Sequence, residues 1–422
     1  MKKSILKKII NIIYQKKLFL FEFLIFLPSS IILIILTRIV QNFKGIKFLP
    51  VNFSRIGNIY PLYWYFRVNE QINFDKGFIN FFFIEDKYKH NKTWLKLWSK
   101  KINLLPFSKI WKNYFFLSKY FPGHNKIKII QYNEFFHNLY LSKKKQKDVI
   151  NFKKYLVKIS NMKKDLLKFS ENEITKGREY LHSVGTKEFS YICFHARDKS
   201  YLKDYDNTKD WSYHDFRDSN IDNYLNVINK LSDKGHHCLR MGSKVEKKIP
   251  SQNPKIIDYA NSSSQSDFLD IYLGSKCLMA VYSESGISVI PEVFNRPIVY
   301  VNWPALNFSC FNSNSLVIPK KFFSKKKNRF LSITEILELN FEESFRGEKL
   351  REMEIDLIEN TPQEISEAVI ENYKRINGDW KDDQEGLDLQ RKFWDIFKFN
   401  YIKSSSFRIG TDYLKKYSQL IQ

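Results

Sequence analysis

The stretch that best indicates the fold is residues 278–303, LMAVYSESGISVIPEVFNRPIVYVNW. It begins with an apolar run, Leu278–Val281, passes through a small polar loop and continues into a helical pattern over 287–295. An Asn-Arg-Pro turn ends that pattern before a second apolar run, Ile298–Val301. Short apolar strands joined by a helix are typical of a parallel sheet, because its strands are buried on both faces.

The same alternation precedes this stretch. Helical patterns at 220–233 and 266–275 separate further apolar runs, for which we expect strands at Tyr191–His195, His237–Met241 and Ile256–Tyr259. Alternating strands and helices predict an α/β fold with crossover helices.

The first half of the chain has a weaker version of this pattern. A strand at Lys47–Phe53, a turn at Ser54–Asn58 and a helix from Ile59 predict the start of a second α/β unit. Further strands are expected at 78–84 and 126–130, and a polar helical connection at 145–183. The capping box Thr361-Pro-Gln-Glu364 predicts a helix over 362–376.

At 422 residues the chain is too long for one ordinary core. We expect an N-terminal basic and apolar segment at 1–45, a first α/β domain with its helical connection at 46–185, a second α/β domain at 186–345 and a helical tail at 346–422; the family resemblance given below implies that the first domain binds the acceptor and the second the donor.

The composition is globular and strongly basic. Apolar residues make up 43% of the chain and aromatic residues 16%, which excludes a wholly disordered protein. The net charge of +24 favours anionic partners such as lipid head groups or phosphorylated substrates. The alternative is a bias of the source genome toward Lys, Ile and Asn, which would produce much of this charge without selecting a ligand.

The four cysteines, Cys193, Cys238, Cys277 and Cys310, form no C-x-x-C pair, and the first three lie in apolar runs. This pattern predicts buried thiols in a reducing compartment, without a disulfide framework or a zinc site.

The N-terminus carries an apolar run, Leu18–Leu36, after a basic stretch with six lysines: Lys2, Lys3, Lys7, Lys8, Lys16 and Lys17. The run is just long enough to cross a bilayer, and no cleavage site of a signal peptide follows it. Pro28-Ser29-Ser30 at its middle favours a re-entrant or interfacial anchor over a simple span. An anionic membrane surface is therefore an expected partner.

Two clusters of polar residues lie at the ends of expected strands. His195, Arg197 and Asp198 lie at the end of the first, and His195 and Arg197 alternate so that both can reach one face. Arg240 and Gly242 lie at the end of the second, where Arg supplies donors for phosphate and Gly lets a backbone approach. The alternative for the first cluster is a surface His and Arg that close the strand with an ion pair to Asp198.

The third cluster is the loop Ser283, Glu284, Ser285 and Gly286, which leads into a helix. Free N–H groups at a helix start and Ser hydroxyls predict an anion site, with Ser288 as a helix cap. A simple capped loop is the alternative.

Weaker motifs have structural interpretations. His214 lies in a charged segment, 213–220, in which Asp218 or Ser219 is expected to cap the next helix. A lone Asp204-Tyr-Asp206 lacks the preceding strand of a metal-nucleotide motif, and His236-His237 is more typical of structure than of metal binding.

These residues resemble a family of bacterial glycosyltransferases of GT-B-like architecture, associated with surface polysaccharides. The resemblance is carried by eight motifs: Arg55-Ile-Gly57, His195-Ala-Arg-Asp198, Tyr213-His-Asp-Phe-Arg-Asp218, Arg240-Met-Gly-Ser243, Ile257-Asp-Tyr259, Asp267-Phe-Leu-Asp270, Ser283-Glu-Ser-Gly286 and Pro297-Ile-Val-Tyr-Val-Asn302. The Ser-x-Ser-Gly loop is similar to the donor site of heptosyltransferases, and the H-x-R element to the phosphate grip of fucosyltransferases.

The resemblance implies two Rossmann-like domains facing a cleft, with the donor bound mainly by the second and no obligatory metal. It implies donor-binding roles for residues of the three clusters and for the turn at Arg55 and Gly57. Where the family pattern has a His, this chain has Asn58, which cannot serve as a general base.

The expected reaction is transfer of a hexosyl or deoxyhexosyl group from a nucleotide sugar to a glycan or lipid-linked acceptor, on the cytoplasmic face of the inner membrane. His195, Asp198 and His214 are the candidates for the base, and nucleic acid is not an expected partner. The alternatives are a pyruvyl transferase of similar architecture and a non-catalytic basic scaffold that binds membrane or nucleic acid.

Overall fold

The computed structural model describes residues 23–73, 76–84, 91–105, 108–123, 127–129, 162, 165–304, 314–339, 347–396 and 407–421. Several expectations lie outside these residues: the six N-terminal lysines, the start of the apolar run, Cys310 and most of 145–164.

The chain forms two compact units. The first comprises Met1–Ser54, Pro61–His90 and Trp98–Lys143, and the second comprises Arg55–Tyr60, Asn91–Leu97 and Lys144–Gln422. The turn with Arg55 and Gly57, expected in the acceptor domain, therefore belongs to the second unit. The predicted boundaries at 45/46, 185/186 and 345/346 stay predictions.

The first unit contains a parallel sheet in the order β2-β1-β3, built from β1 (Gly45–Val51), β2 (Phe78–Ile84) and β3 (Ile127–Ile129). The helices α2 (Tyr60–Ile72) and α4 (Ser108–Ser118) lie almost wholly in this unit, whereas most of α3 (Lys92–Ser99) belongs to the second unit. Phe48 of β1 packs against Phe81, Trp111, Tyr114 and Phe115, whose ring centroids lie 5.1–5.7 Å from its own. The β1 strand begins two residues earlier than predicted.

The N-terminal helix is continuous over Phe23–Val40. Among the described residues it is the one helix long and apolar enough to cross a membrane, and 17% of it is buried. The prediction of a re-entrant turn at Pro28-Ser29-Ser30 is wrong, because the helix passes through these residues without a break. One proline removes a single backbone hydrogen bond and does not reverse the chain, and the Ser30 hydroxyl donates to the Phe26 carbonyl within the helix.

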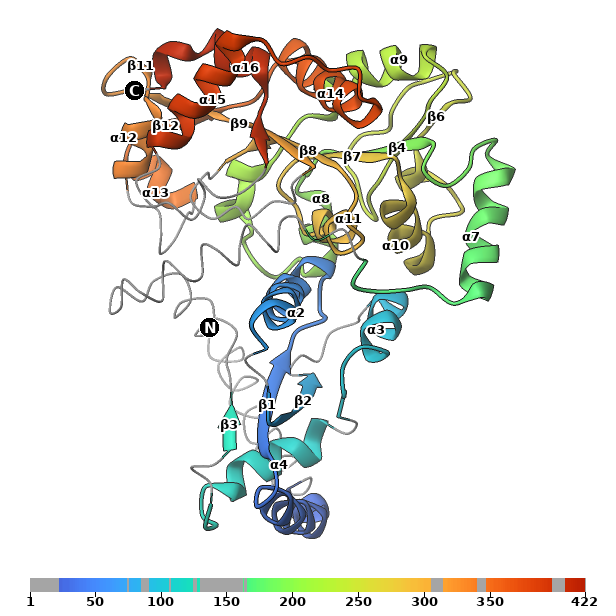
Figure 1. Ribbon diagram of the computed structural model, residues 1–422, viewed down its shortest axis with the longest axis vertical. Helices are drawn as coiled ribbons and strands as arrows, with labels where there is room; N and C mark the ends of the chain where they lie inside the picture. Colours follow the sequence, from blue (N-terminus) through green and yellow to red (C-terminus); the bar gives the residue numbers. More distant parts are fainter. Residues whose placement is uncertain are drawn as a thin grey trace, which may run out of the picture. The chain divides into compact units, whose positions relative to one another are not determined.

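The second unit is built on a parallel sheet with the strand order β13-β9-β8-β7-β4-β5-β6 (Figure 1). Its described strands are β4 (Tyr191–His195), β5 (His237–Arg240), β6 (Ile256–Ile257), β7 (Met279–Tyr282), β8 (Ile298–Trp303), β9 (Ser315–Pro319) and β13 (Arg408–Ile409). Without β13, the order by chain position is 3-2-1-4-5-6, which is the order of the Rossmann fold. The predicted α/β fold class is confirmed.

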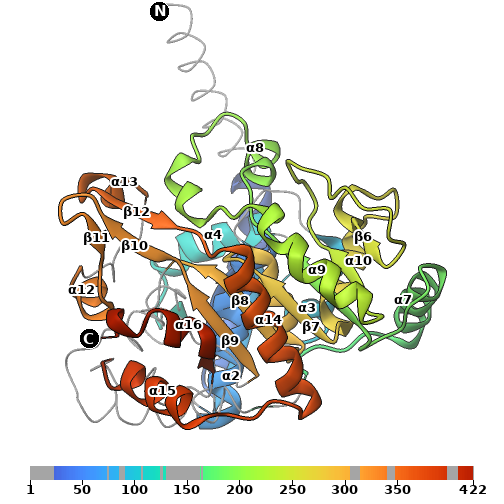
Figure 2. The same cartoon turned by 90° about the horizontal axis from the view of Figure 1, so that it is seen from above.

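Helices cover both faces of this sheet (Figures 1 and 2). On one face lie α9 (Leu225–Asp233) and α14 (Pro362–Asn377), and on the other α10 (Asp267–Lys276) and α11 (Val289–Val293). The other helices are α7 (Glu171–Ser183), α8 (Ser200–Tyr205), α12 (Ile333–Glu338), α13 (Gly347–Glu352), α15 (Gln384–Ile396) and α16 (Thr411–Lys416). Short 3-10 turns are η1 (Ile56–Ile59), η3 (Ser212–Arg217), η4 (Ile221–Tyr224), η5 (Tyr259–Asn261), η6 (Gly286–Ser288) and η7 (Ser418–Leu420).

The predicted capping box of α14 is present, since the Thr361 hydroxyl accepts from the Glu364 N–H and Glu364 accepts from the Thr361 N–H. The predicted helical tail also contributes strands. A second, antiparallel sheet has the order β11-β10-β12, with β10 (Lys321–Ser324), β11 (Arg329–Phe330) and β12 (Ile355–Ile358). Cys193, Cys238 and Cys277 are buried and free.

Candidate functional site

A pocket of about 540 Å³ opens at the carboxyl ends of the central strands of the second unit. Its lining comes from the last residues of β4 and β8, from the segments after β4, β5 and β7, and from η1 and α10. The strand order reverses between β4 and β7. In open α/β sheets, ligands bind at this switch point.

Ten of the twelve predicted site residues line this pocket: Arg55, Gly57, His195, Arg197, Asp198, His214, Gly242, Glu284, Ser285 and Gly286. Their individual roles stay predictions. Arg240 and Ser283 do not line it.

His195 is the last residue of β4, and one of its ring nitrogens is hydrogen-bonded within the protein. Its Nδ1 lies 3.0 Å from the Met241 carbonyl oxygen, which can only accept, so Nδ1 carries the proton. Burial lowers the pKa of His195 to about 4. The ring is therefore neutral at pH 7 and offers Nε2 as an acceptor.

Arg197 and Ser283 fasten the loops that follow β4 and β7. The Arg197 N–H donates to the Ser283 Oγ over 2.8 Å, and Ser283 is fully buried. The Arg197 guanidinium pairs with Asp218 and donates to the His214 carbonyl. Burial lowers the pKa of Arg197 to about 10, so it stays charged.

Arg240 lies away from the pocket. Its guanidinium donates to the Asp258 Oδ1 over 3.1 Å and to the Lys247 carbonyl over 3.2 Å, and its side chain is almost fully buried. It lines a separate cavity of about 240 Å³. Arg240 therefore holds the segments around Lys247 and Asp258 together, beside the predicted donor site.

Two glycines bring η1 and the Ser283–Gly286 loop into backbone contact. A Cβ placed on Gly57 would lie 2.5 Å from the Gly286 Cα, and one on Gly286 would lie 3.0 Å from the Gly57 nitrogen. Gly242 has a positive φ of 148°, and a Cβ there would lie 2.8 Å from the Val245 side chain. Glycine is required at these positions for close approach.

The loop between β7 and α11 carries one unsatisfied hydroxyl. The Ser285 Oγ is buried and has no hydrogen-bond partner among the residues that the structure describes. Next to it, Glu284 pairs with Arg217 over 3.3 Å. The predicted capping role of Ser288 is wrong, because its hydroxyl donates to the Ser285 carbonyl, and α11 is only five residues long.

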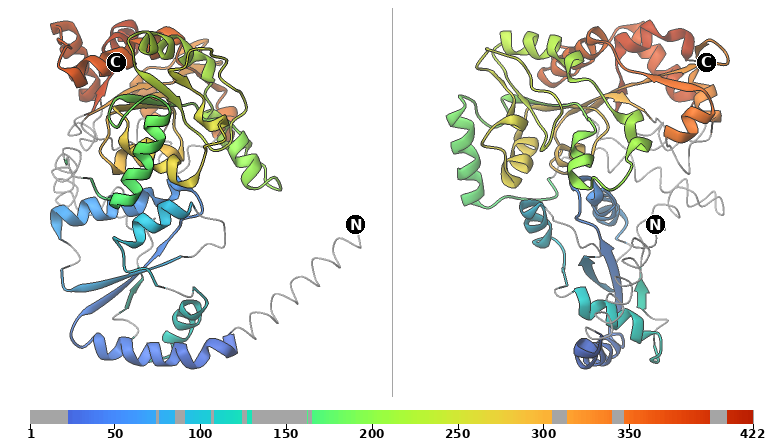
Figure 3. Two further views of the ribbon diagram at one scale, coloured as in Figure 1. Left: turned by 90° about the vertical axis from the view of Figure 1, so that its right-hand side faces the viewer. Right: turned by 180° about the vertical axis from the view of Figure 1, so that it is seen from behind.

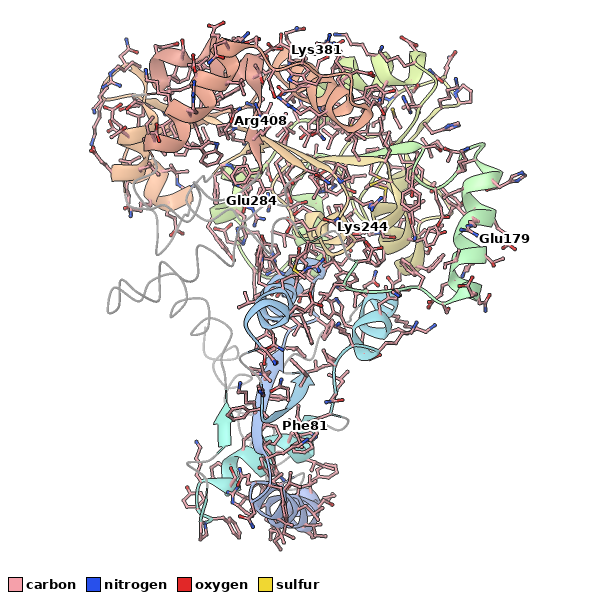
Figure 4. All side chains as sticks on the ribbon, viewed as in Figure 1. Phe81, Glu179, Lys244, Glu284, Lys381 and Arg408 are labelled. Atoms are coloured by element: carbon pink, nitrogen blue, oxygen red, sulfur yellow. The ribbon has the colours of Figure 1, made fainter. Side chains whose placement is uncertain are left out.

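Arg55 and Lys244 are pocket cations for which no carboxylate partner is found in the described parts of the chain. The Arg55 guanidinium lies 5.9 Å from the ring centroids of both Tyr205 and Trp211, which favours a fixed cation by cation–π attraction. Lys244 is exposed and follows β5. Figure 4 labels Lys244 and Glu284 among the loops at this edge of the sheet.

The candidate bases Asp198 and His214 have local partners. Asp198 accepts from the Ser200 and Glu246 N–H groups, each over 2.9 Å. The His214 ring lies 4.1 Å from the Tyr213 ring. The prediction that Asp218 or Ser219 caps the next helix is wrong, because Asn220 caps η4 while Asp218 pairs with Arg197.

Two acidic residues in the lining were missed as site residues. Burial raises the pKa of Asp270 to about 6, against hydrogen bonds from Tyr259 and Gln265. Burial raises the pKa of Glu292 to about 8, against hydrogen bonds from Tyr300 and Tyr60. Both lie in helical patterns that are otherwise largely apolar. A carboxylate among apolar residues is the feature of the sequence that could have pointed to them.

In the two motifs considered for metal binding, Asp204-Tyr-Asp206 and His236-His237, side chains are hydrogen-bonded within the protein. Asp206 accepts from the N–H and hydroxyl of Thr208. His236 contacts the Tyr373 hydroxyl and the Ser190 carbonyl. Within the described residues no group of three or more His, Cys, Asp or Glu is arranged to hold a metal ion.

No protein-family model matches the sequence, and no curated protein matches it either. Solved structures show a low similarity. A glycosyl transferase family 9 protein from Veillonella parvula is 10% identical, with a TM-score of 0.41 over 78% of this chain and 98% of that one.

Two heptosyltransferases from E. coli are also similar. WaaC with ADP-2-deoxy-2-fluoro heptose is 11% identical, with a TM-score of 0.32 over 64% of this chain and 92% of that one. ADP-heptose LPS heptosyltransferase II is 12% identical, with a TM-score of 0.33 over 64% and 90%. TM-scores this low give no support to a particular function.

Proposed function

We propose that this chain is a glycosyltransferase that takes a sugar from a nucleotide diphosphate donor. The observation that carries the proposal is the place of the pocket, at the switch point of a sheet with the Rossmann strand order. Its lining adds what a diphosphate needs: the unsatisfied Ser285 hydroxyl, and the cations Arg55 and Lys244. The sequence motifs that resemble the glycosyltransferase family support the same function.

The reaction breaks the bond between the sugar and the diphosphate and joins the sugar to an acceptor oxygen, whose proton passes to a base. Negative charge grows on the leaving diphosphate, and Arg55 and Lys244 would neutralise it. Arg197 is already paired with Asp218, so it holds the loop in place. We expect no obligatory metal in this scheme.

We propose that Asp270, a carboxylate in the pocket lining, takes the acceptor proton. A base works best when its pKa lies near the working pH, and Asp270, whose pKa burial raises to about 6, is ionised at pH 7. His195 is a much weaker base, and Glu292, with a pKa of about 8, is mainly protonated at pH 7.

Asp270→Asn is expected to lower kcat/KM at least about a hundredfold. In the wild type, kcat/KM should fall as the pH drops below about 6, because the carboxylate becomes protonated; this limb should be missing from the variant's pH profile. Glu292→Gln is the control and should keep the limb. A limb unchanged in Asp270→Asn would refute the assignment.

The acceptor and the setting rest on the sequence resemblance. We propose a hexosyl or deoxyhexosyl transfer to a glycan or lipid-linked acceptor in surface polysaccharide synthesis, on the cytoplasmic face of the membrane. Turnover of a panel of nucleotide sugars, with and without EDTA, tests the donor class and the expected independence from metal.

Arg55→Ala and Lys244→Ala are each expected to weaken binding of a nucleoside diphosphate by about tenfold, because each removes a charge-assisted contact to phosphate. Titration calorimetry with ADP, GDP and UDP measures this. Lys248→Ala is the matched control, since Lys248 is exposed nearby and does not line the pocket. Failure of all three nucleotides to bind the wild type would overturn the proposed function.

A further inference from the structure

The N-terminal helix Phe23–Val40, drawn in dark blue in Figure 3, has one buried and one exposed face. Ile34 is 1% exposed and lies in a core cluster with Phe48, Trp111 and Tyr114. The other side carries exposed apolar residues at helical spacing: Leu24, Ile25, Ile32, Ile35, Leu36, Ile39 and Val40. Ile25, Ile32 and Ile39, seven residues apart, are each more than half exposed.

The buried face is fastened to α4 along the length of the helix. The Asn113 side chain donates to the Phe23 carbonyl, and Ser30 donates to the Ile110 carbonyl. Further along, the Thr37 hydroxyl lies 3.0 Å from the Tyr114 hydroxyl. These contacts hold the helix as part of the first unit.

The far end of the helix is held as well, because the Arg38 guanidinium donates to the Ser118 and Pro122 carbonyls. A helix fastened in this way cannot cross a bilayer alone. It would carry with it residues 108–122, which include three lysines and an asparagine. Buried in hydrocarbon, these groups are costly.

The exposed face continues onto α4. The Phe116 ring lies 5.8 Å from the Phe23 ring, and both Phe116 and Tyr120 are exposed. Phe43, just past the helix, is 84% exposed. Exposed Lys44 follows Phe43 and exposed Lys119 precedes Tyr120, so cationic side chains neighbour this surface in the chain. The sequence before the helix adds six lysines.

We propose that this face, comprising the exposed apolar residues of 24–43 with Phe116 and Tyr120, lies in the plane of an anionic bilayer surface as a monotopic attachment. An apolar stripe with aromatic and basic neighbours fits the interface between head groups and acyl chains. The proposal stands on the first unit alone and does not depend on the proposed reaction.

The first test is flotation of the full chain with phosphatidylcholine vesicles, with and without phosphatidylglycerol. The triple variant Ile25→Gln, Ile32→Gln, Ile39→Gln should lower partitioning at least about tenfold, because it removes apolar area at the interface. The matched control replaces three exposed apolar residues of the second unit, Phe189, Ile358 and Leu387, by Gln. It should bind like the wild type.

The second test measures depth. Single cysteines at Ile25, Ile32 and Ile39 carry a fluorophore in a Cys310→Ser background, since the other three cysteines are buried. Quenching by lipids labelled at different depths should place all three positions equally shallow. A profile with Ile32 deepest indicates a span and overturns the proposal.

Two further results would also overturn it. One is equal loss of vesicle binding in the control triple variant. The other is a wild type that binds no vesicles and forms a dimer that the Gln triple variant dissociates, which would make this face a contact between copies of the chain.

Discussion

Replacing Glu364 by Gln is expected to lower the free energy of unfolding by about 3–5 kcal/mol, the usual effect of removing one partner from a buried ion pair. The Glu364 side chain is fully buried and accepts from the Lys321 ammonium over 2.9 Å and the Lys416 ammonium over 2.7 Å. Lys321 is itself 3% exposed. The variant would leave that ammonium buried without its counter-charge.

The same carboxylate predicts how stability depends on pH. Burial raises the pKa of Glu364, but hydrogen bonds from Lys416, Tyr417 and Lys321 outweigh it and lower the pKa from 4.5 to about 2. The stabilisation is therefore present above pH 4.5 and is lost as the pH falls from 4.5 to 2. Urea unfolding at several pH values should show this loss in the wild type and not in Glu364→Gln.

Glu335 provides a matched control. It also holds the N3 position of a capping box and also pairs with two cations, Lys327 and Arg329, but those cations are half exposed. Exposed ion pairs contribute little to stability, so Glu335→Gln should cause a much smaller loss. Equal losses in both variants would show that burial is not the cause. Glu364→Leu combined with Lys321→Met should recover part of the stability.

The second large effect is expected at the glycine contact. Gly57→Ala places a methyl group 2.5 Å from the Gly286 Cα, where backbone meets backbone and no side chain can rotate away. The turn with Arg55 must move from the Ser285 loop. Displacements of about 1 Å near reacting groups cost on the order of a hundredfold in rate, so we expect kcat/KM to fall by about that factor.

Gly347→Ala is the control for this change. A Cβ there meets its nearest neighbour, the Tyr213 carbonyl oxygen, at 3.4 Å, which is ordinary contact. Both variants should keep the wild-type far-UV circular dichroism spectrum, and only Gly57→Ala should lose nucleotide binding. Full activity in Gly57→Ala would show that the two turns can separate without harm to the site.

Five strands of the central sheet, β4 to β8, could be predicted from the sequence because each is a short apolar run between polar breaks, whereas β9 (Ser315–Pro319) was missed. β4 has the predicted bounds, Tyr191–His195, and β7 is shifted by one residue. The two-residue β13 could not be predicted, because two residues show no periodicity. It joins the sheet only through pairing of Arg408 and Ile409 with β9.

The candidate site was predicted in part for the same reason. Residues at or just after the ends of apolar runs, such as His195 and Ser285, line the pocket because parallel strands end at a common edge. The sequence could not show that the Arg240 guanidinium is already paired with Asp258. Nor could it show that burial shifts the pKa values of Asp270 and Glu292.

The stretch 278–303, by itself, determined the local sequence of strand, loop and helix, since apolar spacing and glycine act over a few residues. Only the tertiary structure decided the strand order, and with it the switch point between β4 and β7. It also decided which ions are paired and which face of the N-terminal helix is free. These properties depend on contacts between residues far apart in the chain, which no local pattern records.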